Sequence, residues 1–178
     1  MAKIIKDKRL EDDAWQVLTF SEEQTPETLS ALELPETPVL VPLALWRLRA
    51  DELCPRANAG TLGVWLAPGD DPKEIADDVD NFAVIGVSFP KFADGRGFST
   101  GRLLRERYGY KGELRAFGDI SRDQLFYLSR VGFNSFVFPA GRDAEDALPS
   151  FNDFPETYQG ATDRPDPLFR RRVAALSN

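Results

Sequence analysis

Short apolar runs alternate with amphipathic stretches along the central part of the chain. Five runs have the length of strands: 38–41 (PVLV), 61–66 (TLGVWL), 82–87 (FAVIGV), 113–117 (ELRAF) and 135–138 (SFVF). The run at 82–87 is apolar throughout, which is typical of a strand buried on both faces. Between the runs lie stretches with helical character, such as 43–53 and the segment that holds Leu103, Leu104 and Tyr108. The pattern predicts strands that alternate with helices.

Capping residues indicate where two of these helices begin. Ser121 and Gln124 have the spacing of a capping box, so we expect a helix to start just after Ser121. Ser99 or Thr100 is expected to cap the helix that holds Leu103, and Gly109 to end it.

The two ends of the chain differ from this central part. Residues 3–18 predict a β-hairpin with a charged turn near 8–13, and the acidic segment 21–38 contains three prolines, as expected of an irregular wrap. Beyond 140 the chain is polar and proline-rich, and 168–176 (LFRRRVAAL) predicts a short basic helix. We therefore predict one domain over 1–178, with a hairpin at 1–20, a wrap at 21–38, a parallel α/β core at 39–140 and an irregular tail at 141–178.

Alternating strands and helices imply parallel βαβ units with right-handed crossovers. About five parallel strands fit either an open doubly wound sheet or a partial β/α barrel, and the periodicity leaves both open. Five are too few for a closed eight-stranded barrel. A partial barrel would leave sheet edges that a homodimer would cover, which is a hypothesis at this point.

Several classes of protein are excluded by composition. The chain has no histidine and one cysteine, Cys54, so it lacks a haem histidine ligand, a four-cysteine iron–sulfur site and a Ser-His-Asp triad. We expect no metal site. Redox chemistry would need a flavin, a nicotinamide or a partner protein, and neither cofactor is excluded. No apolar run approaches the ~20 residues of a membrane helix, and the N-terminal residues lack the apolar segment of a signal peptide. We expect a cytoplasmic protein that does not bind membranes.

Charge is distributed unevenly. Residues 91–134 hold nine Lys and Arg against five Asp and Glu, a surplus of four positive charges in a chain whose net charge is −7. Such a basic block favours an anionic ligand or an acidic partner surface. The overall acidity argues against nucleic-acid binding. The plain alternative for any single arginine is a solvated helix face with ion pairs between residues i and i+4.

Parallel topology would bring three polar loops to one rim, because loops at the carboxyl ends of parallel strands share an edge of the sheet. These loops hold Asp94, Gly95, Arg96 and Gly97, then Gly118 and Asp119, then Arg142. Glycines permit close approach and helix N-termini bind anions. The Gly-Arg-Gly at 95–97 is not a dinucleotide fingerprint, because the third glycine would fall at Thr100. A simple turn at 94–97 and a helix cap at Asp119 are the alternatives.

The block DGRGFSTGRLLRERYGYKGELRAFGDISRDQLFYLSRVGFN, 94–134, resembles a bacterial family, a domain of unknown function. Its members are labelled oxidoreductases of sulfite reduction and tend to be encoded beside assimilatory sulfite reductase. Phe98 stands where the family usually has tyrosine, which argues against a catalytic phenol there. The polar set that the resemblance implies is Asp94, Arg96, Ser99, Arg102, Arg105, Arg115, Asp119, Arg122, Asp123 and Gln124.

Three functions are compatible with these observations. The first, implied by the resemblance, is an accessory protein of assimilatory sulfite reduction that docks on sulfite reductase or serves it. The second is an oxidoreductase with a bound flavin or nicotinamide, although the chain has no recognisable catalytic motif. The third is a non-catalytic module that binds a small anion such as sulfite or sulfate.

Overall fold

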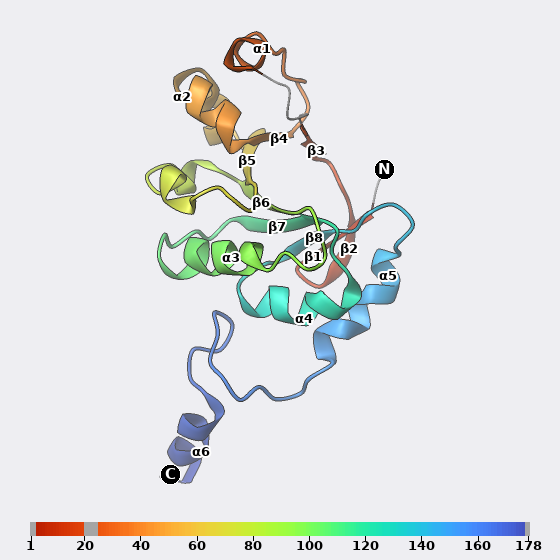
Figure 1. Cartoon of the computed structure of the whole chain (residues 1–178). Coiled ribbons are helices and arrows are strands. Elements are labelled where there is room, and N and C mark those ends of the chain that lie inside the picture. Colours follow the sequence, from red (N-terminus) through yellow and green to blue (C-terminus); the bar gives the residue numbers. More distant parts are fainter. Residues whose placement is uncertain (1–2, 20–24, 177–178) are drawn as a thin grey trace.

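The computed structural model describes residues 3–19 and 25–176, and its course is shown in Figure 1. The strands are β1 (Lys3–Lys6), β2 (Arg9–Asp12), β3 (Gln16–Val17), β4 (Val39–Pro42), β5 (Leu62–Leu66), β6 (Val84–Phe89), β7 (Glu113–Gly118) and β8 (Ser135–Val137). The helices are α1 (Pro26–Ser30), α2 (Leu43–Asn58), α3 (Arg96–Glu106), α4 (Arg122–Arg130), α5 (Ala144–Ala147) and α6 (Leu168–Leu176). Short 3₁₀ turns lie at η1 (Pro72–Ile75), η2 (Val79–Asn81) and η3 (Leu148–Asn152).

The described strands form one sheet in the order β2-β1-β8-β7-β6-β5-β4-β3. Strands β3 to β8 are parallel and neighbours in sequence, whereas β1 pairs antiparallel with β8 and with β2. The α/β class and the parallel core are confirmed. The expected number of parallel strands was too low, because the two-residue β3 is too short to leave a hydrophobic pattern.

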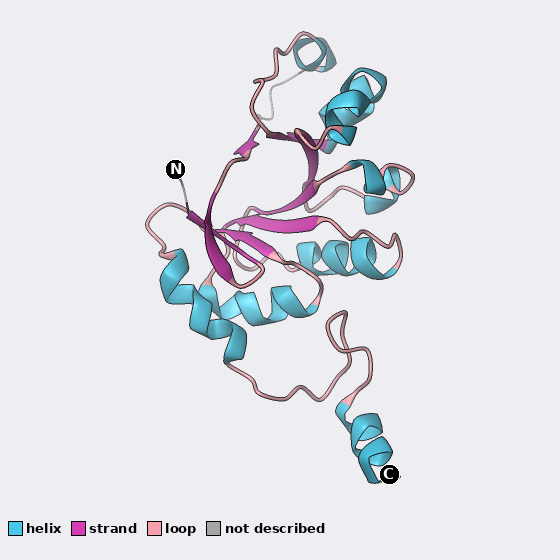
Figure 2. Cartoon of the chain, turned by 180° about the vertical axis from the view of Figure 1, so that it is seen from behind, coloured by secondary structure: helices cyan, strands magenta, loops and turns pink. Residues whose placement is uncertain are grey.

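The sheet curls into a half-barrel rather than an open doubly wound sheet. Strands β3 to β8 follow one another in sequence order, and the helices cover only the outer face of the sheet (Figure 2). The two edge strands, β2 and β3, are joined by residues 13–15 alone. Four Cα–Cα steps span at most about 15 Å, so the end of β2 lies within that distance of the start of β3. The linking segment therefore crosses the open side of the arc.

The N-terminal hairpin is present with boundaries other than those expected. Its turn consists of Asp7 and Lys8, both with positive φ (48° and 63°), which is the geometry of a type I′ turn. Neither residue is glycine or asparagine, so the sequence carried no strong turn signal there. Residues 16–17, expected in the second arm, instead begin the parallel series as β3.

The main hydrophobic core lies between the outer face of the sheet and the helices. Val41, Val64, Ile85, Leu114 and Phe136 are among the strand residues buried in it. The intervening strand residues face the inside of the arc, as the pleat requires. Helix α3 begins at Arg96, earlier than Ser99 or Thr100 would place it, and the Thr100 hydroxyl lies 3.4 Å from the Arg96 carbonyl oxygen inside the helix.

The C-terminal part is more ordered than the predicted irregular tail. It holds α5, η3 and α6, and the basic helix expected at 168–176 is confirmed. Figure 1 shows α6 extending away from the sheet at the end of a long loop. Of the predicted wrap, residues 21–24 lie outside the described residues, and 26–30 form α1. No helix in the described ranges is long and apolar enough to cross a membrane.

Candidate binding site at the sheet rim

Asp119 connects three loops, at the carboxyl ends of β6, β7 and β8, through hydrogen bonds. Its Oδ2 accepts a hydrogen bond from the Phe92 backbone N–H at 3.0 Å, and its Oδ1 accepts from Arg142 Nη2, also at 3.0 Å. Arg142 also donates through Nη1 to the Ile120 carbonyl oxygen. Asp119 therefore joins loops that are distant in sequence, as the parallel topology predicted. It does so as a bridge between loops rather than as a helix cap.

Gln124 completes this rim network from the first turn of α4. Its Oε1 accepts from the Ser121 backbone N–H at 3.2 Å, which forms that half of the predicted capping box. Its Nε2 donates to the Phe92 carbonyl oxygen at 3.1 Å. Phe92 is therefore held through both backbone polar groups, while its own side chain is about half exposed.

Two glycines allow these loops to meet. Gly118 has a φ of +108°, and a Cβ there would collide with the Phe89 carbonyl oxygen. That oxygen accepts from the Asp119 backbone N–H at 2.6 Å. Gly97 packs on the Phe89 ring, and a Cβ there would lie 2.5 Å from its Cζ. Gly95, in contrast, has open space around it and an ordinary φ of −82°.

A pocket of about 370 Å³ opens at this rim between α4 and α5, and we call it the rim pocket. Its lining consists of Ser121, Arg122, Phe138, Arg142, Asp143, Asp146 and Ala147. Arg122 is exposed and makes no hydrogen bond or salt bridge with any described residue. Its neighbour Asp123 is also exposed. The α4 N-terminus adds the partial positive charge of free backbone N–H groups.

Asp94 and Arg96 bind each other in the loop before α3. Arg96 Nε and Nη2 donate to the two carboxylate oxygens of Asp94 at 2.9 and 2.7 Å, and the Arg96 backbone N–H donates to Oδ1 at 3.2 Å. The hydrogen bond from Arg96 lowers the pKa of Asp94 and raises that of the arginine. Because the carboxylate already occupies the guanidinium, Arg96 is a weaker anion ligand than Arg122.

Three other predicted residues lie on α3, outside the rim. Ser99 and Arg102 are on its exposed face, where Arg102 Nε donates to Glu106 Oε2 at 2.8 Å, an i,i+4 pair of the kind expected as the plain alternative. Arg105 lies at the opposite end of the sheet. Its guanidinium donates to the carbonyl oxygens of Tyr110, Gly112 and Gly132, at 2.7, 2.9 and 2.9 Å. Burial lowers the pKa of Arg105.

Arg115 points into the inside of the half-barrel and has only 1% of its side chain exposed. Its Nη1 donates to Asp13 Oδ1 at 2.9 Å and its Nη2 to Glu113 Oε1 at 2.7 Å, while Lys6 Nζ lies 2.8 Å from Glu113 Oε2. We call these four residues the interior ion cluster. Burial raises the pKa of Glu113, but the Arg115 charge and the Lys6 hydrogen bond outweigh it, so the net pKa lies below 4.5.

A comparison with known families assigns the chain. A family model described as "Bacterial protein of unknown function (DUF934)" matches residues 63–169, which is more than half of the sequence. The chain belongs to this family. No curated protein matches the chain closely enough to suggest an activity.

The DUF934 match contains the rim network and the rim pocket entirely, since every one of their residues lies between 92 and 147. It contains Glu113 and Arg115 of the interior ion cluster but not Lys6 or Asp13, which come from the N-terminal strands and the link that follows them. The match extends from β5 to the start of α6.

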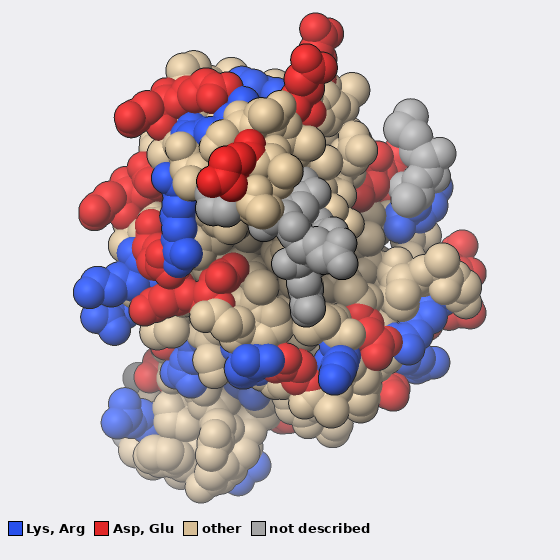
Figure 3. All heavy atoms as spheres, turned by 45° about the horizontal axis from the view of Figure 1, so that its top comes forward, with Lys and Arg blue, Asp and Glu red and all other residues tan. Residues whose placement is uncertain are grey.

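The basic block of this DUF934 protein is largely neutralised by its own partners. Most of its arginines are bound to carboxylates or carbonyl oxygens. The side chains of Lys91, Arg107, Lys111 and Arg122 make no hydrogen bond or salt bridge with described residues, although Arg107 lies over the Tyr108 ring. On the face in Figure 3, basic and acidic side chains are intermingled. The surplus of positive charge is therefore concentrated at a few positions, of which Arg122 is the one that lines the rim pocket.

Several residues of the site were not predicted. Phe138, Asp143, Asp146 and Ala147 line the rim pocket, and Phe92 is held by the rim network. Phenylalanines are ordinarily packing residues, and the acids lie in a polar segment without a motif, so the sequence carried no signal for them. Among the described residues, no group of three Asp, Glu or Cys side chains is placed to hold a metal ion.

Proposed function

We propose that this chain is an accessory protein of assimilatory sulfite reduction, which uses the rim pocket to bind an anion. The anion is either an acidic side chain on the surface of sulfite reductase or sulfite itself. The link to sulfite reduction rests on the resemblance of the block at 94–134, and the location of the site rests on the geometry of the rim. We expect the protein to act in the cytoplasm, since its single cysteine has no partner for an internal disulfide.

The proposal rests on one observation, the exposed and unpaired side chain of Arg122. It lies in the first turn of α4, is exposed, lines the rim pocket and has no carboxylate bound to it in the described structure. An arginine of this kind is free to bind a carboxylate or a sulfur oxyanion through two parallel hydrogen bonds. Arg142 lines the same pocket, but its charge is paired with Asp119, and Asp143 and Asp146 also line the pocket, so Arg122 is the unpaired cation there.

The docking form of the proposal is tested by co-elution of the protein with the sulfite reductase of the same organism. We expect a complex that weakens as salt rises, because exposed charge pairs are screened. Arg122→Glu should abolish the complex. The matched control is Lys111→Glu, which reverses an exposed, unpaired charge ahead of β7, away from the rim. A complex that survives Arg122→Glu, or no complex at low salt, would contradict docking through this pocket.

The unpaired guanidinium of Arg122 also supports the second candidate, a small-anion binding module, and the pocket of about 370 Å³ has room for sulfite or sulfate. A ligand that binds only the native state raises the melting temperature. We expect millimolar sulfite to raise it for the wild type and for Lys111→Glu, but not for Arg122→Glu. No rise for the wild type would eliminate this candidate.

A further inference from the structure

A second hollow lies at the opposite end of the sheet from the rim pocket. Two adjoining cavities of about 330 and 300 Å³ share Lys8, Ser129, Phe151 and Asp163 in their linings, so they form one continuous groove. The groove lies between the hairpin turn, the end of α4 and the chain that follows η3, and we call it the tail groove. The hairpin turn is fixed at this end, because the Asp7 backbone N–H donates to the carbonyl oxygen of Asn134, just ahead of β8, at 2.8 Å.

The lining of the tail groove is rich in phenylalanine. Phe126 and Phe154 line one part, Phe133 and Phe136 the other, and Phe151 lies between them in both. The rings contact one another, with centroids 4.9 Å apart for Phe126 and Phe154 and 5.5 Å apart for Phe136 and Phe151. Phe154 is about half exposed. The other four rings are buried, with 1–8% of their surface exposed, so Phe154 offers most of the apolar surface on which an aromatic or aliphatic group can pack.

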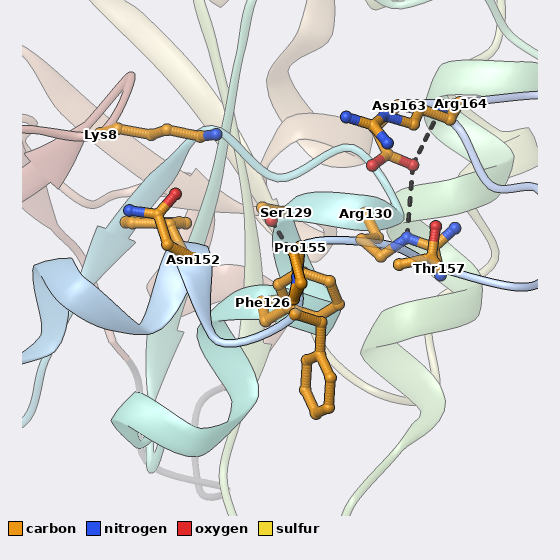
Figure 4. Close-up of a pocket in the computed structure, with 11 residues that line it drawn as sticks. Lys8, Phe126, Ser129, Arg130, Asn152, Pro155, Thr157, Asp163 and Arg164 are labelled. Atoms are coloured by element: carbon orange, nitrogen blue, oxygen red, sulfur yellow. Dashed lines mark hydrogen bonds and ion pairs between the residues drawn. The ribbon is translucent and has the colours of Figure 1, made fainter.

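Lys8 is the cation of the tail groove that has no acidic partner. Its Nζ lies 5.7 Å from the centroid of the Phe151 ring, and it makes no salt bridge with any described carboxylate. Figure 4 shows its side chain extending into the groove, with Asp163 and Arg164 on the far side. An exposed lysine over an aromatic floor, without a salt bridge, is suited to an anionic group that sits beside an apolar one.

The remaining charges of the groove are already bound. Arg130 has 12% of its side chain exposed, donates through Nη2 to the Gln159 carbonyl oxygen at 2.6 Å, and has its Nε 3.4 Å from Asp163 Oδ1. Arg164 Nη1 lies 3.4 Å from Glu156 Oε1. Asp7 Oδ1 accepts from Asn134 Nδ2 at 3.0 Å. Asp163 and Glu156 are thus paired with arginines, whereas Asp7 bonds to a neutral amide and keeps its negative charge. The lining holds three cations, Lys8, Arg130 and Arg164, against two acids, Asp7 and Asp163, so one positive charge remains in excess.

We propose that the tail groove binds a carboxylate carried on an aromatic or aliphatic group. The apolar part packs on the phenylalanines, and the carboxylate binds the Lys8 ammonium. Two sources share this chemistry: a free organic acid, and a peptide that ends in an apolar residue. This site is independent of the rim pocket, and its success or failure leaves the proposed function unchanged.

The test is a thermal shift with matched pairs of probes. 3-Phenylpropionate is compared with 3-phenylpropionamide, and N-acetyl-glycyl-phenylalanine with its C-terminal amide, so that each pair differs in the carboxylate charge alone. We expect the acids to raise the melting temperature by about 3–6 °C at roughly ten times Kd, and the amides to have little effect.

The variant that localises the effect is Lys8→Asn. Asparagine removes the charge and tolerates the left-handed backbone of position 8, where φ is 63°. The control is Lys91→Asn, an exposed lysine in the β6–α3 loop at the other end of the sheet. We expect Lys8→Asn to lose most of the shift and Lys91→Asn to keep it.

The outcomes separate the two sources and decide the proposal. A shift with 3-phenylpropionate alone identifies a free acid, a shift with the peptide alone identifies a chain terminus, and both support the site. The proposal is overturned by equal shifts with acids and amides, by a full shift in Lys8→Asn, or by no shift with either acid at about 10 mM.

Discussion

Single residues at the rim act first through backbone geometry. The left-handed φ of Gly118 turns the chain at the end of β7, and the absence of a Cβ lets the turn pass close to the Phe89 carbonyl oxygen. Asp119 then reaches the backbone N–H of Phe92, and Arg142 reaches Asp119. The position of the rim pocket therefore depends on one glycine as much as on its arginines.

Gly118→Ala should destabilise the fold by about 2 kcal/mol or more, because a side chain there is strained both by φ and by the Phe89 carbonyl. Gly95→Ala is the matched control, since that position has open space and negative φ. We expect its effect to stay within about 0.5 kcal/mol. Urea denaturation measures both, and similar losses in the two variants would contradict the account of the rim.

Glu113→Gln should destabilise the fold by about 3 kcal/mol, because it leaves Arg115 partly uncompensated in the interior. Glu106→Gln removes an exposed partner of Arg102 instead and should cost less than about 0.5 kcal/mol. Chemical denaturation at neutral pH compares the two. Equal losses of stability in the two variants would mean that the interior ion cluster stabilises the fold no more than a surface ion pair does.

The pH dependence of stability should also reveal the contribution of the interior ion cluster. The folded-state pKa of Glu113 lies below 4.5, so its contribution is complete above that pH and is lost as the pH falls through the lower, folded value. We expect the wild type to lose more stability than Glu113→Gln between about pH 5 and pH 3. If the stability of the wild type and of Glu113→Gln fell in parallel across this pH range, the ionised Glu113 would contribute nothing to the pH dependence.

At the scale of secondary-structure elements, the local hydrophobic pattern predicted the strands and helices that pack against the core. The five apolar runs became β4 to β8, and the Ser121–Gln124 pair marked the start of α4. The hairpin register and β3 could not be predicted, because the turn at Asp7 and Lys8 lacks glycine and β3 is two residues long. Capping preference also misplaced the start of α3, which lies at Arg96.

The structural role of Arg105 could not be predicted from the sequence either. Sequence shows an arginine on a helix, and only the fold shows that its guanidinium connects the last turn of α3 to the segments that enter β7 and β8. Its carbonyl partners are backbone groups, which no residue pattern reveals. The family resemblance put Arg105 and Arg115 in the polar set of the site, whereas their contacts place them away from the rim.

Arg105→Lys should destabilise the fold by about 2 kcal/mol, because an ammonium cannot reproduce the planar fork that satisfies three carbonyl oxygens. Arg102→Lys, in the same helix and exposed, should change stability by less than about 0.5 kcal/mol. The comparison uses urea midpoints. A tolerated Arg105→Lys would show that the connection between α3 and the strands does not depend on these hydrogen bonds.

For the whole molecule, the three-residue link between β2 and β3 constrains the shape of the sheet. It keeps the end of β2 near the start of β3, and Asp13 within it reaches Arg115 on β7. Sequence left a doubly wound sheet and a partial barrel equally open, because both have the same local pattern. Only the pairing of β1 with β8 and the sequential strand order distinguish them.

The sheet edges also bear on the homodimer hypothesis. Edge strand β2 has four residues, among them Arg9, Glu11 and Asp12, and edge strand β3 has two. Short and charged edges resist pairing with other chains. We therefore expect light scattering at high concentration to give the monomer mass of 19.9 kDa. A mass near twice this value would restore the homodimer hypothesis.

The central claim is that the rim pocket binds an anion through Arg122, and an NMR titration with sulfite tests it most directly. In ¹⁵N-labelled protein we expect saturable shifts of the backbone amides of Ser121, Arg122 and Arg142, which line the pocket. Arg122→Glu should remove these shifts, and Lys111→Glu should retain them. Absent shifts, or shifts that centre on α3 or α6 and persist in Arg122→Glu, would contradict the claim.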